Sequence, residues 1–323
     1  MMQVARVSLV ATLCALFAVP SVAADPYPDR PIRLIVPFSP GGGTDINARI
    51  LADPIGNGLG QTIVVDNRPG AGSTLGSSIV ARATPDGYTL LLGTISLTVN
   101  AAVYKELPFD VQKDLVPITR VSDQPSILVV HPSLPARTFR DFTKLVRSSP
   151  GKFSFGSPGV GTGSHLASEM LWLRIGAQLL HVPFKGTGPA LNSLIGDQIT
   201  LYMSTFASAL PHVKQGRLRA YAVTTLKRAV PLPEIPTLDE EGLEGFEYAS
   251  WYGLFAPAGT PKAILAKIHT ATVAALKSPA VLKIYHEQGL NATPTTPEEF
   301  ARYIAAERRK WSGVVREAHI AQM

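Results

Sequence analysis

The segment Ile32-Arg33-Leu34-Ile35-Val36-Pro37-Phe38 is a short apolar run that leads directly into Ser39-Pro40-Gly41-Gly42-Gly43-Thr44-Asp45. A helical pattern then continues to about Gly56. An apolar run that is bounded by turn residues and followed by a helix is typical of a buried strand in a βαβ unit. The segment therefore predicts a parallel α/β sheet whose first strand ends in a glycine-rich loop.

Other short apolar runs end in glycine- or serine-rich loops in the same way. The loop at 66–73 follows an expected strand at 62–65, and the loop at 93–96 follows one at 88–92. Alternation of strands and helices at this spacing favours a parallel sheet. Further strands are expected at 126–130, 152–155, 179–184, 199–203, 218–223 and 251–255. Helices are expected after the loop at 66–73 to about Ala83, at 139–148, at 165–175, from Pro189, at 261–277 and at 297–319.

The pattern restarts near residue 124, which predicts two lobes with a ligand cleft between them. We expect lobe 1 to comprise residues 25–124 and 250–323, and lobe 2 to comprise residues 125–249. Each lobe would be a mostly parallel sheet flanked by helices. Trp251 and Tyr252 are expected to pack at the return between the lobes, with the wall of the cleft as the alternative position.

Residues 1–24 have the pattern of a secretory signal peptide. Arg6 supplies a positive charge, residues 7–19 are apolar, and residues 21–24 have small side chains suited to cleavage. A membrane anchor is the alternative, but about 13 apolar residues are too few to span a bilayer. A lipoprotein site at Cys14 is set aside because a large side chain precedes the cysteine. Cleavage would leave 299 of the 323 residues and no cysteine, which predicts a periplasmic protein.

The composition excludes several classes of protein. Hydrophobic residues make up 46% of the chain and charged residues 17%, so the chain can bury a core and is not disordered. The single cysteine excludes an internal disulfide framework and a cysteine-rich zinc site. The net charge is +6, but the basic residues are scattered apart from Arg308-Arg309-Lys310. We therefore expect no nucleic-acid partner.

The glycine-rich loops point to recognition of a small anion. A loop between a strand and a helix presents unpaired backbone N–H groups, which bind anions without a charged side chain. Gly41, Gly42 and Gly43 would let the backbone approach a ligand closely, and Thr44 or Asp45 would cap the following helix. The loop at 159–164 would do the same in the second lobe. Two such loops that face each other would hold a carboxylate from both sides.

Known catalytic and cofactor motifs do not match the chain. The glycines are not spaced as in a phosphate-binding or dinucleotide-binding loop, and no G-x-S-x-G nucleophile motif occurs. His165 and Glu169 lie one helical turn apart, but no third metal ligand stands at a motif spacing. We expect His165 to hydrogen-bond the loop or the ligand, and Lys185 either to meet a carboxylate or to cover the surface. We expect no catalytic residue, metal or cofactor.

Several longer motifs make the chain resemble the Bug family, the periplasmic solute-binding proteins of tripartite tricarboxylate transporters. The motifs include Pro31-Ile32-Arg33-Leu34-Ile35-Val36-Pro37-Phe38, Asp66-Asn67-Arg68-Pro69-Gly70-Ala71-Gly72, His181-Val182-Pro183-Phe184-Lys185-Gly186 and Trp251-Tyr252-Gly253-Leu254-Phe255-Ala256-Pro257. The resemblance covers nearly the whole chain after the expected signal peptide. It implies a two-lobed type II periplasmic-binding-protein fold that closes on one ligand.

The resemblance also implies a small organic carboxylate as the ligand and a large and a small membrane permease subunit as partners of a monomer. The family commonly has Phe-Asp after the strand at 199–203, whereas this chain has Ser204-Thr205, which weakens recognition of a ligand amino group or sugar-like hydroxyl. The expected ligand-binding residues are Phe38, Gly41, Gly42, Gly43, Thr44, Asp45, Gly93, Thr94, Ser96, Gly161, Thr162, Gly163, Ser164, His165, Lys185, Gly186 and Ser204.

Two other functions fit the same pattern. A ligand-sensing component of a membrane signalling system would share the binding chemistry. A periplasmic hydrolase on the same fold is less favoured, although a catalytic triad assembled in space leaves no trace in the sequence.

Overall fold

The computed structural model describes residues 27–317 of the 323-residue chain. The expected signal peptide at 1–24 and the end of the expected helix at 297–319 lie outside the described residues. Among the helices that the structure describes, none is both long enough and apolar enough to cross a membrane.

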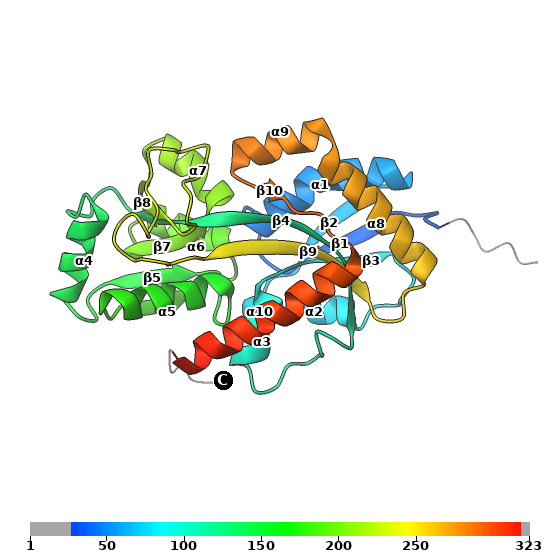
Figure 1. Cartoon of the computed structure of the whole chain (residues 1–323), viewed down its shortest axis with the longest axis horizontal. Helices are drawn as coiled ribbons and strands as arrows, with labels where there is room; N and C mark the ends of the chain where they lie inside the picture. The colour runs from blue at the N-terminus through cyan, green and yellow to red at the C-terminus, as the bar shows by residue number, and fades with distance from the viewer. Residues whose placement is uncertain (1–26, 318–323) are drawn as a thin grey trace, which may run out of the picture.

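One half of the molecule contains three parallel strands that continue into two antiparallel ones (Figure 1). The order across this part of the sheet is β2, β1, β3, β9 and β4, and the short strand β10 pairs with β4. The bounds are β1 (Ile32–Val36), β2 (Ile63–Asn67), β3 (Thr89–Thr94), β4 (Leu115–Val130), β9 (Ala249–Pro257) and β10 (Asn291–Ala292).

Helices cover both faces of the sheet in this half, so β1 is buried on both sides. Leu34 and Val36 pack in the core with residues of α1, α8 and α9, whereas the intervening Ile35 packs in a second core with residues of α3 and α10. The bounds are α1 (Gly43–Leu59), α2 (Thr74–Ala81), α3 (Ser96–Val103), α8 (Lys262–Lys277), α9 (Pro279–Gln288) and α10 (Pro297–Glu317), with a 3₁₀ turn η1 (Ala71–Ser73) before α2.

The other half repeats this layered arrangement. Strands β6, β5 and β7 are parallel, and β7 and β8 both pair antiparallel with the end of β4. The bounds are β5 (Ser154–Ser157), β6 (Leu180–Pro183), β7 (Leu201–Thr205), β8 (Arg219–Val223), α4 (Phe139–Arg147), α5 (Gly163–Ile175), α6 (Thr187–Ile195) and α7 (Phe206–Lys214).

Strand β4 belongs to both halves. Its residues Leu115–Pro125 pair with β9, and Ser126–Val130 pair with β7 and β8. The sequence predicted only the part at 126–130. Pro117 and Pro125 obscured the strand pattern of residues 115–125. The register of the β4–β9 ladder shifts between Pro117 and Thr119, and a proline, which has no N–H to donate, is tolerated at such an irregularity.

Three helices were not predicted from the sequence: α3, α7 and α9. In α3 almost every residue is buried, from Ser96 to Val103, so no polar face marks the helix in the sequence.

The C-terminal helix α10 packs on β9 through aromatic side chains. Trp251 is fully buried and meets the rings of Phe300 and Tyr303 edge to face. Its indole N–H donates to the Glu307 carboxylate at 3.2 Å. The ring of Phe300 also occupies the space where a Cβ atom at Gly253 would lie. Trp251 thus packs in the core and does not line the cleft, which matches the first of the two positions expected for it.

We expect Gly253→Ala to destabilise the protein by about 1–3 kcal/mol, because the added methyl group would overlap the Phe300 ring in a packed core. Gly313→Ala is the control, since nothing lies near a Cβ at that position of α10. It should stabilise the protein by about 0.5–1 kcal/mol by lowering the entropy of the unfolded chain. Urea unfolding measures both changes, and equal effects would contradict the described packing of α10 on β9.

Candidate functional site

A cavity lies where the two halves of the molecule meet. About 40 Å³ inside it is open to the centre of a water molecule. This space would hold about three waters, at roughly 10–15 Å³ each. The lining residues are Phe38, Gly42, Gly43, Thr44, Thr94, Ile95, Ser96, Pro158, Thr162, Gly163, Ser164, Thr187, Thr205, Tyr248, Ser250 and Tyr252.

Five helices begin at this cavity. Helices α1 and α3 reach it from one half of the molecule, and α5, α6 and α7 reach it from the other, each with residues of its first turn or its N-cap in the lining. The first turn of a helix leaves N–H groups without partners inside the helix and carries the positive end of the dipole. The combined effect is a positive potential at the cavity that suits an anion.

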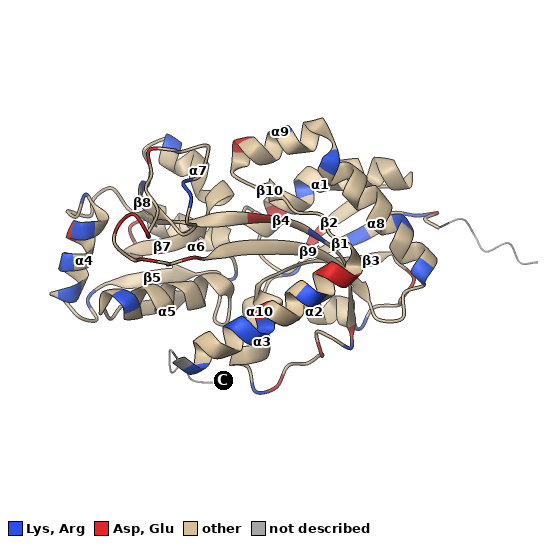
Figure 2. Ribbon diagram, viewed as in Figure 1, with Lys and Arg blue, Asp and Glu red and all other residues tan. Residues whose placement is uncertain are grey.

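Charged side chains are not the source of this potential. Among the residues that the structure describes, those lining the cavity include no Asp, Glu, Lys, Arg or His. Figure 2 shows that Lys and Arg are instead spread over outer helices such as α4, α8 and α10.

Buried hydroxyl groups supply further hydrogen-bond donors. The Tyr252 hydroxyl accepts a hydrogen bond from Gln124 Nε2 at 2.5 Å, and Gln124 Oε1 accepts one from the Ala207 N–H of α7 at 3.1 Å. The Tyr248 hydroxyl shares a hydrogen bond of 3.1 Å with the Ser250 hydroxyl. Burial raises the pKa of both tyrosines above its usual value, so both phenols keep their protons. A phenol that accepts from Gln124 retains its own proton for donation.

The two halves touch beside the cavity through loops rich in glycine. Ser39 donates from its N–H at 3.2 Å and from its hydroxyl at 2.9 Å to the carbonyl of Lys185. A Cβ at Gly188 would lie 2.5 Å from the Pro40 carbonyl oxygen, and one at Gly72 would overlap the Val160 carbonyl. Side chains at these glycines would hold the halves apart, so the bare backbone permits the close approach.

The structure brings together nine of the expected site residues in the cavity lining. These are Phe38, Gly42, Gly43, Thr44, Thr94, Ser96, Thr162, Gly163 and Ser164. Tyr252 also lies there, in the second of its two expected positions. Sequence reasoning missed Ile95, Pro158, Thr187, Thr205, Tyr248 and Ser250 as lining residues. Thr187 and Thr205 had a detectable signal, because each stands in the loop that follows an expected strand.

Asp45 fastens the loop that precedes α1 and does not line the cavity. Its carboxylate accepts from the Gly41 N–H, from Arg49 Nε and from Asn67 Nδ2, each at 3.0 Å. Burial alone would raise the pKa of Asp45, but these three donors hold the pKa below its usual value. The expectation that Thr44 or Asp45 would be the N-cap is wrong, because Gly42 is the N-cap and both residues lie inside the helix.

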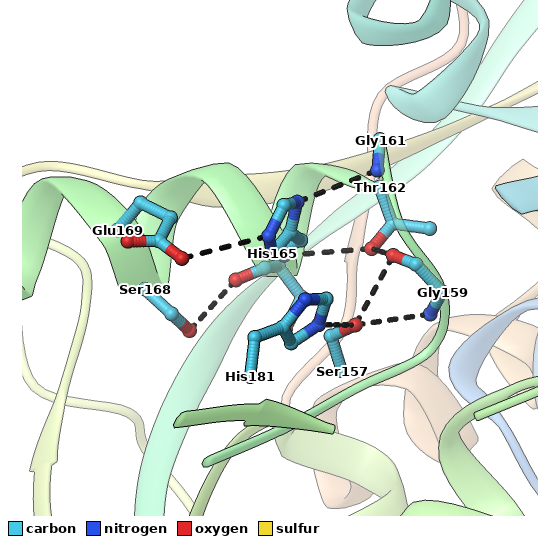
Figure 3. A network of polar contacts seen from close by, with 9 residues as sticks. Ser157, Gly159, Gly161, Thr162, His165, Ser168, Glu169 and His181 are labelled. Atoms are coloured by element: carbon cyan, nitrogen blue, oxygen red, sulfur yellow. Dashed lines mark hydrogen bonds and ion pairs between the residues drawn. The ribbon is translucent and has the colours of Figure 1, made fainter. Parts of the chain in front are cut away.

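His165 also lies behind the cavity wall. Its Nδ1 accepts from the Gly161 N–H at 3.4 Å, which confirms the expected hydrogen bond to the loop (Figure 3). Gly161 itself faces Asn100 and Tyr104 instead of the cavity.

The remaining expected residues are placed around the site by backbone contacts. The side chain of Lys185 is exposed, which matches the alternative that it covers the surface. Gly186 is the N-cap of α6 and packs against Ser39. Gly93 packs under the rings and methyl groups of Phe255 and Leu97, and the buried Ser204 hydroxyl donates to the Thr205 carbonyl at 3.1 Å.

One pair in the structure has the separation of a nucleophile and its base. The Ser157 hydroxyl lies 2.6 Å from His181 Nε2, but Ser157 is fully buried and also bonds the backbone of Gly159. In the part of the chain that the structure describes, no group of three or more His, Cys, Asp or Glu residues could hold a metal ion.

Comparisons with known proteins identify the family. Residues 47–320 match TctC, the tripartite tricarboxylate transporter family receptor. Protein BugT of Bordetella pertussis is 38% identical over 298 residues, with 92% of this chain and 91% of BugT covered. A Rhodopseudomonas palustris protein solved with adipate is 32% identical, with a TM-score of 0.89 over 92% of this chain and 100% of that one.

MatC from Rhodopseudomonas palustris, solved with bound malate, is also 32% identical, with a TM-score of 0.85 over 90% of this chain and 100% of that one. These similarities confirm the expected two-lobed fold and the resemblance to the Bug family. The chain belongs to the TctC family of tripartite tricarboxylate transporter receptors.

Proposed function

We propose that this chain is a periplasmic receptor that closes two lobes around a small organic carboxylate and delivers it to a membrane transporter. The observation that carries the proposal is the convergence of five helix N-termini on one cavity, whose lining contains no charged side chain among residues 27–317. Unpaired N–H groups and a positive dipole end favour an anion at each of these termini. The proposed lobe boundaries are those expected from the sequence, 25–124 with 250–323, and 125–249.

A short dicarboxylate is the ligand class that fits the site best. Helices α1 and α3 would receive one carboxylate from one lobe, and α5, α6 and α7 would receive the other from the opposite lobe. The hydroxyls of Tyr248 and Tyr252 would contact the groups between them. Adipate and malate, which two relatives bind, are both short dicarboxylates.

The direct ligand contacts would come from those expected residues that line the cavity. The other expected residues act on the backbone: Asp45 fixes the loop at Gly41, and Gly186 and the Lys185 carbonyl hold the lobes together. The residues that line the cavity would then determine the ligand affinity, and the residues behind the lining would determine the shape of the site.

The partners follow from the family. A large and a small permease subunit would receive the ligand from a monomeric receptor, and the receptor itself would catalyse no reaction. Family membership and the signal-like pattern of residues 1–24 support a periplasmic location.

Thermal melting against a panel of carboxylates tests the proposed ligand class. A dicarboxylate at about 100 times its Kd should stabilise the folded protein by about 2.7 kcal/mol. The Tm should rise by about 5 °C in a chain of this size. Malate, adipate, succinate and citrate form the panel, and the dimethyl ester of succinate is the control without carboxylates. A Tm that rises as much with the ester as with succinate would contradict recognition of the carboxylates.

Gly43→Ala tests the role of the α1 N-terminus. A methyl group at this position would overlap the Gln124 amide and the Tyr252 hydroxyl and would narrow the cavity. We expect the Kd of the panel acid with the largest Tm shift to rise at least about tenfold, measured by isothermal titration.

Gly196→Ala, at the C-terminal end of α6, is the matched control because a Cβ there makes only ordinary contacts. It should leave the Kd unchanged. Unchanged affinity in Gly43→Ala would remove the start of α1 from the binding site.

A further inference from the structure

The loop from Ser157 to Thr162 has two roles in the structure. Pro158 and Thr162 line the cavity. Val160 faces the other half of the molecule, where its carbonyl accepts a hydrogen bond from the Tyr104 hydroxyl at 3.4 Å. The position of this loop therefore affects both the wall of the cavity and the contact between the halves.

Two stacked imidazole rings hold this loop from behind. The rings of His165 and His181 are 4.0 Å apart and inclined by 19° (Figure 3). Phe155 stacks on His181 at 4.8 Å. His165 Nδ1 accepts from the Gly161 N–H, and His181 Nε2 lies 2.6 Å from the Ser157 hydroxyl. Each ring thus fastens one end of the loop.

The contact with Gly161 selects one tautomer of the neutral His165 ring. A nitrogen that accepts a backbone N–H carries no proton, so the proton of the neutral ring is on Nε2. Nε2 lies 3.6 Å from the Glu169 carboxylate. A second proton would have to enter at Nδ1, where it would meet the Gly161 N–H and remove the acceptor.

Few other titratable groups face the ring. Glu169 lies on the same helix, His181 comes from β6, and Phe155 of β5 brings no charge. On the loop side, Tyr104 faces Gly161, and burial raises the pKa of Tyr104, so this phenol stays neutral. Burial and then the neighbouring His165 lower the pKa of His181 to about 3. Of the two stacked rings, His165 is the one with a carboxylate, that of Glu169, beside it.

We propose that His165 and His181 are positioning residues that hold the Ser157–Thr162 loop only while His165 is neutral, so that protonation of His165 loosens the loop and weakens carboxylate binding. The effect on binding rests on the proposed function, whereas the effect on the loop does not. The state in which the histidines hold the loop binds one proton fewer than the loosened state. The affinity for the carboxylate is therefore highest at higher pH and falls as the pH drops. One linked proton limits the loss of affinity to about tenfold for each pH unit.

Hydrogen–deuterium exchange of the loop, measured without any carboxylate, tests the proposal. In the unaltered protein, the Gly159–Gly161 amides should lose protection by about tenfold between about pH 7.5 and about pH 5, after correction for the intrinsic pH dependence of exchange. His165→Asn places an amide oxygen where Nδ1 lies and does not titrate, so its protection should be the same at both pH values. His286→Asn, on the exposed side of α9, is the matched control and should behave like the unaltered protein.

An equal loss of protection in His165→Asn and the unaltered protein would overturn the proposal, as would the absence of any loss in the unaltered protein. Imidazole ¹⁵N spectra provide a second test that needs no variant. The proposal requires the neutral Nε2–H form of His165 at about pH 7.5, and the Nδ1–H form would overturn it.

The consequence for binding is measured separately, by isothermal titration with malate and adipate at the same two pH values. A larger loss of affinity at the lower pH in the unaltered protein than in His165→Asn supports the proposal. The same loss in both proteins would assign the pH dependence to the acid and overturn the role of His165 in binding. Failure of every carboxylate to bind at either pH would overturn the proposed function and the proposed effect of His165 on binding. The hydrogen–deuterium exchange result would still decide whether the histidines hold the loop.

Discussion

The antiparallel pairing of β4 with β9 holds the two halves of the molecule in one continuous sheet. The ladder runs from Leu115 opposite Pro257 to Pro125 opposite Ala249, after which β4 continues into the second half as the partner of β7 and β8. A hydrophobic core also extends from one half into the other. Because these strands fix where the halves meet, helices that begin at the strand ends of both halves can face one cavity.

That geometry gives the site its chemistry. Helix termini, backbone N–H groups and protonated tyrosines supply positive potential and donors with little dependence on pH. The net charge of +6 is therefore weak evidence about the ligand, because the basic side chains lie on outer helices away from the cavity lining. The stacked histidines behind the wall are the titratable element on which the proposed pH response rests. Recognition and its regulation would then use different atoms of the same loop.

The sequence predicted the parts of the site that depend on local backbone structure. Gly43 and Ser164 belong to the glycine-rich stretches that follow short apolar strands, so their place at a helix start could be inferred from neighbouring residues. Tyr248 could not be inferred in this way, because a return from the second half brings it to the cavity. Asp45 was expected among the ligand contacts, but its carboxylate accepts from Gly41, Arg49 and Asn67 and does not line the cavity. The first part of β4 was missed because Pro117 and Pro125 interrupt the apolar pattern that would mark a strand.

The central claim is that a carboxylate is held by helix N-termini from both halves. A crystal structure with the tightest-binding dicarboxylate of the panel tests this claim most directly. We predict carboxylate oxygens within about 3.2 Å of first-turn N–H groups of α1 or α3 on one side and of α5, α6 or α7 on the other. Carboxylates that are bound by Lys or Arg side chains, or by one half of the molecule only, would contradict it.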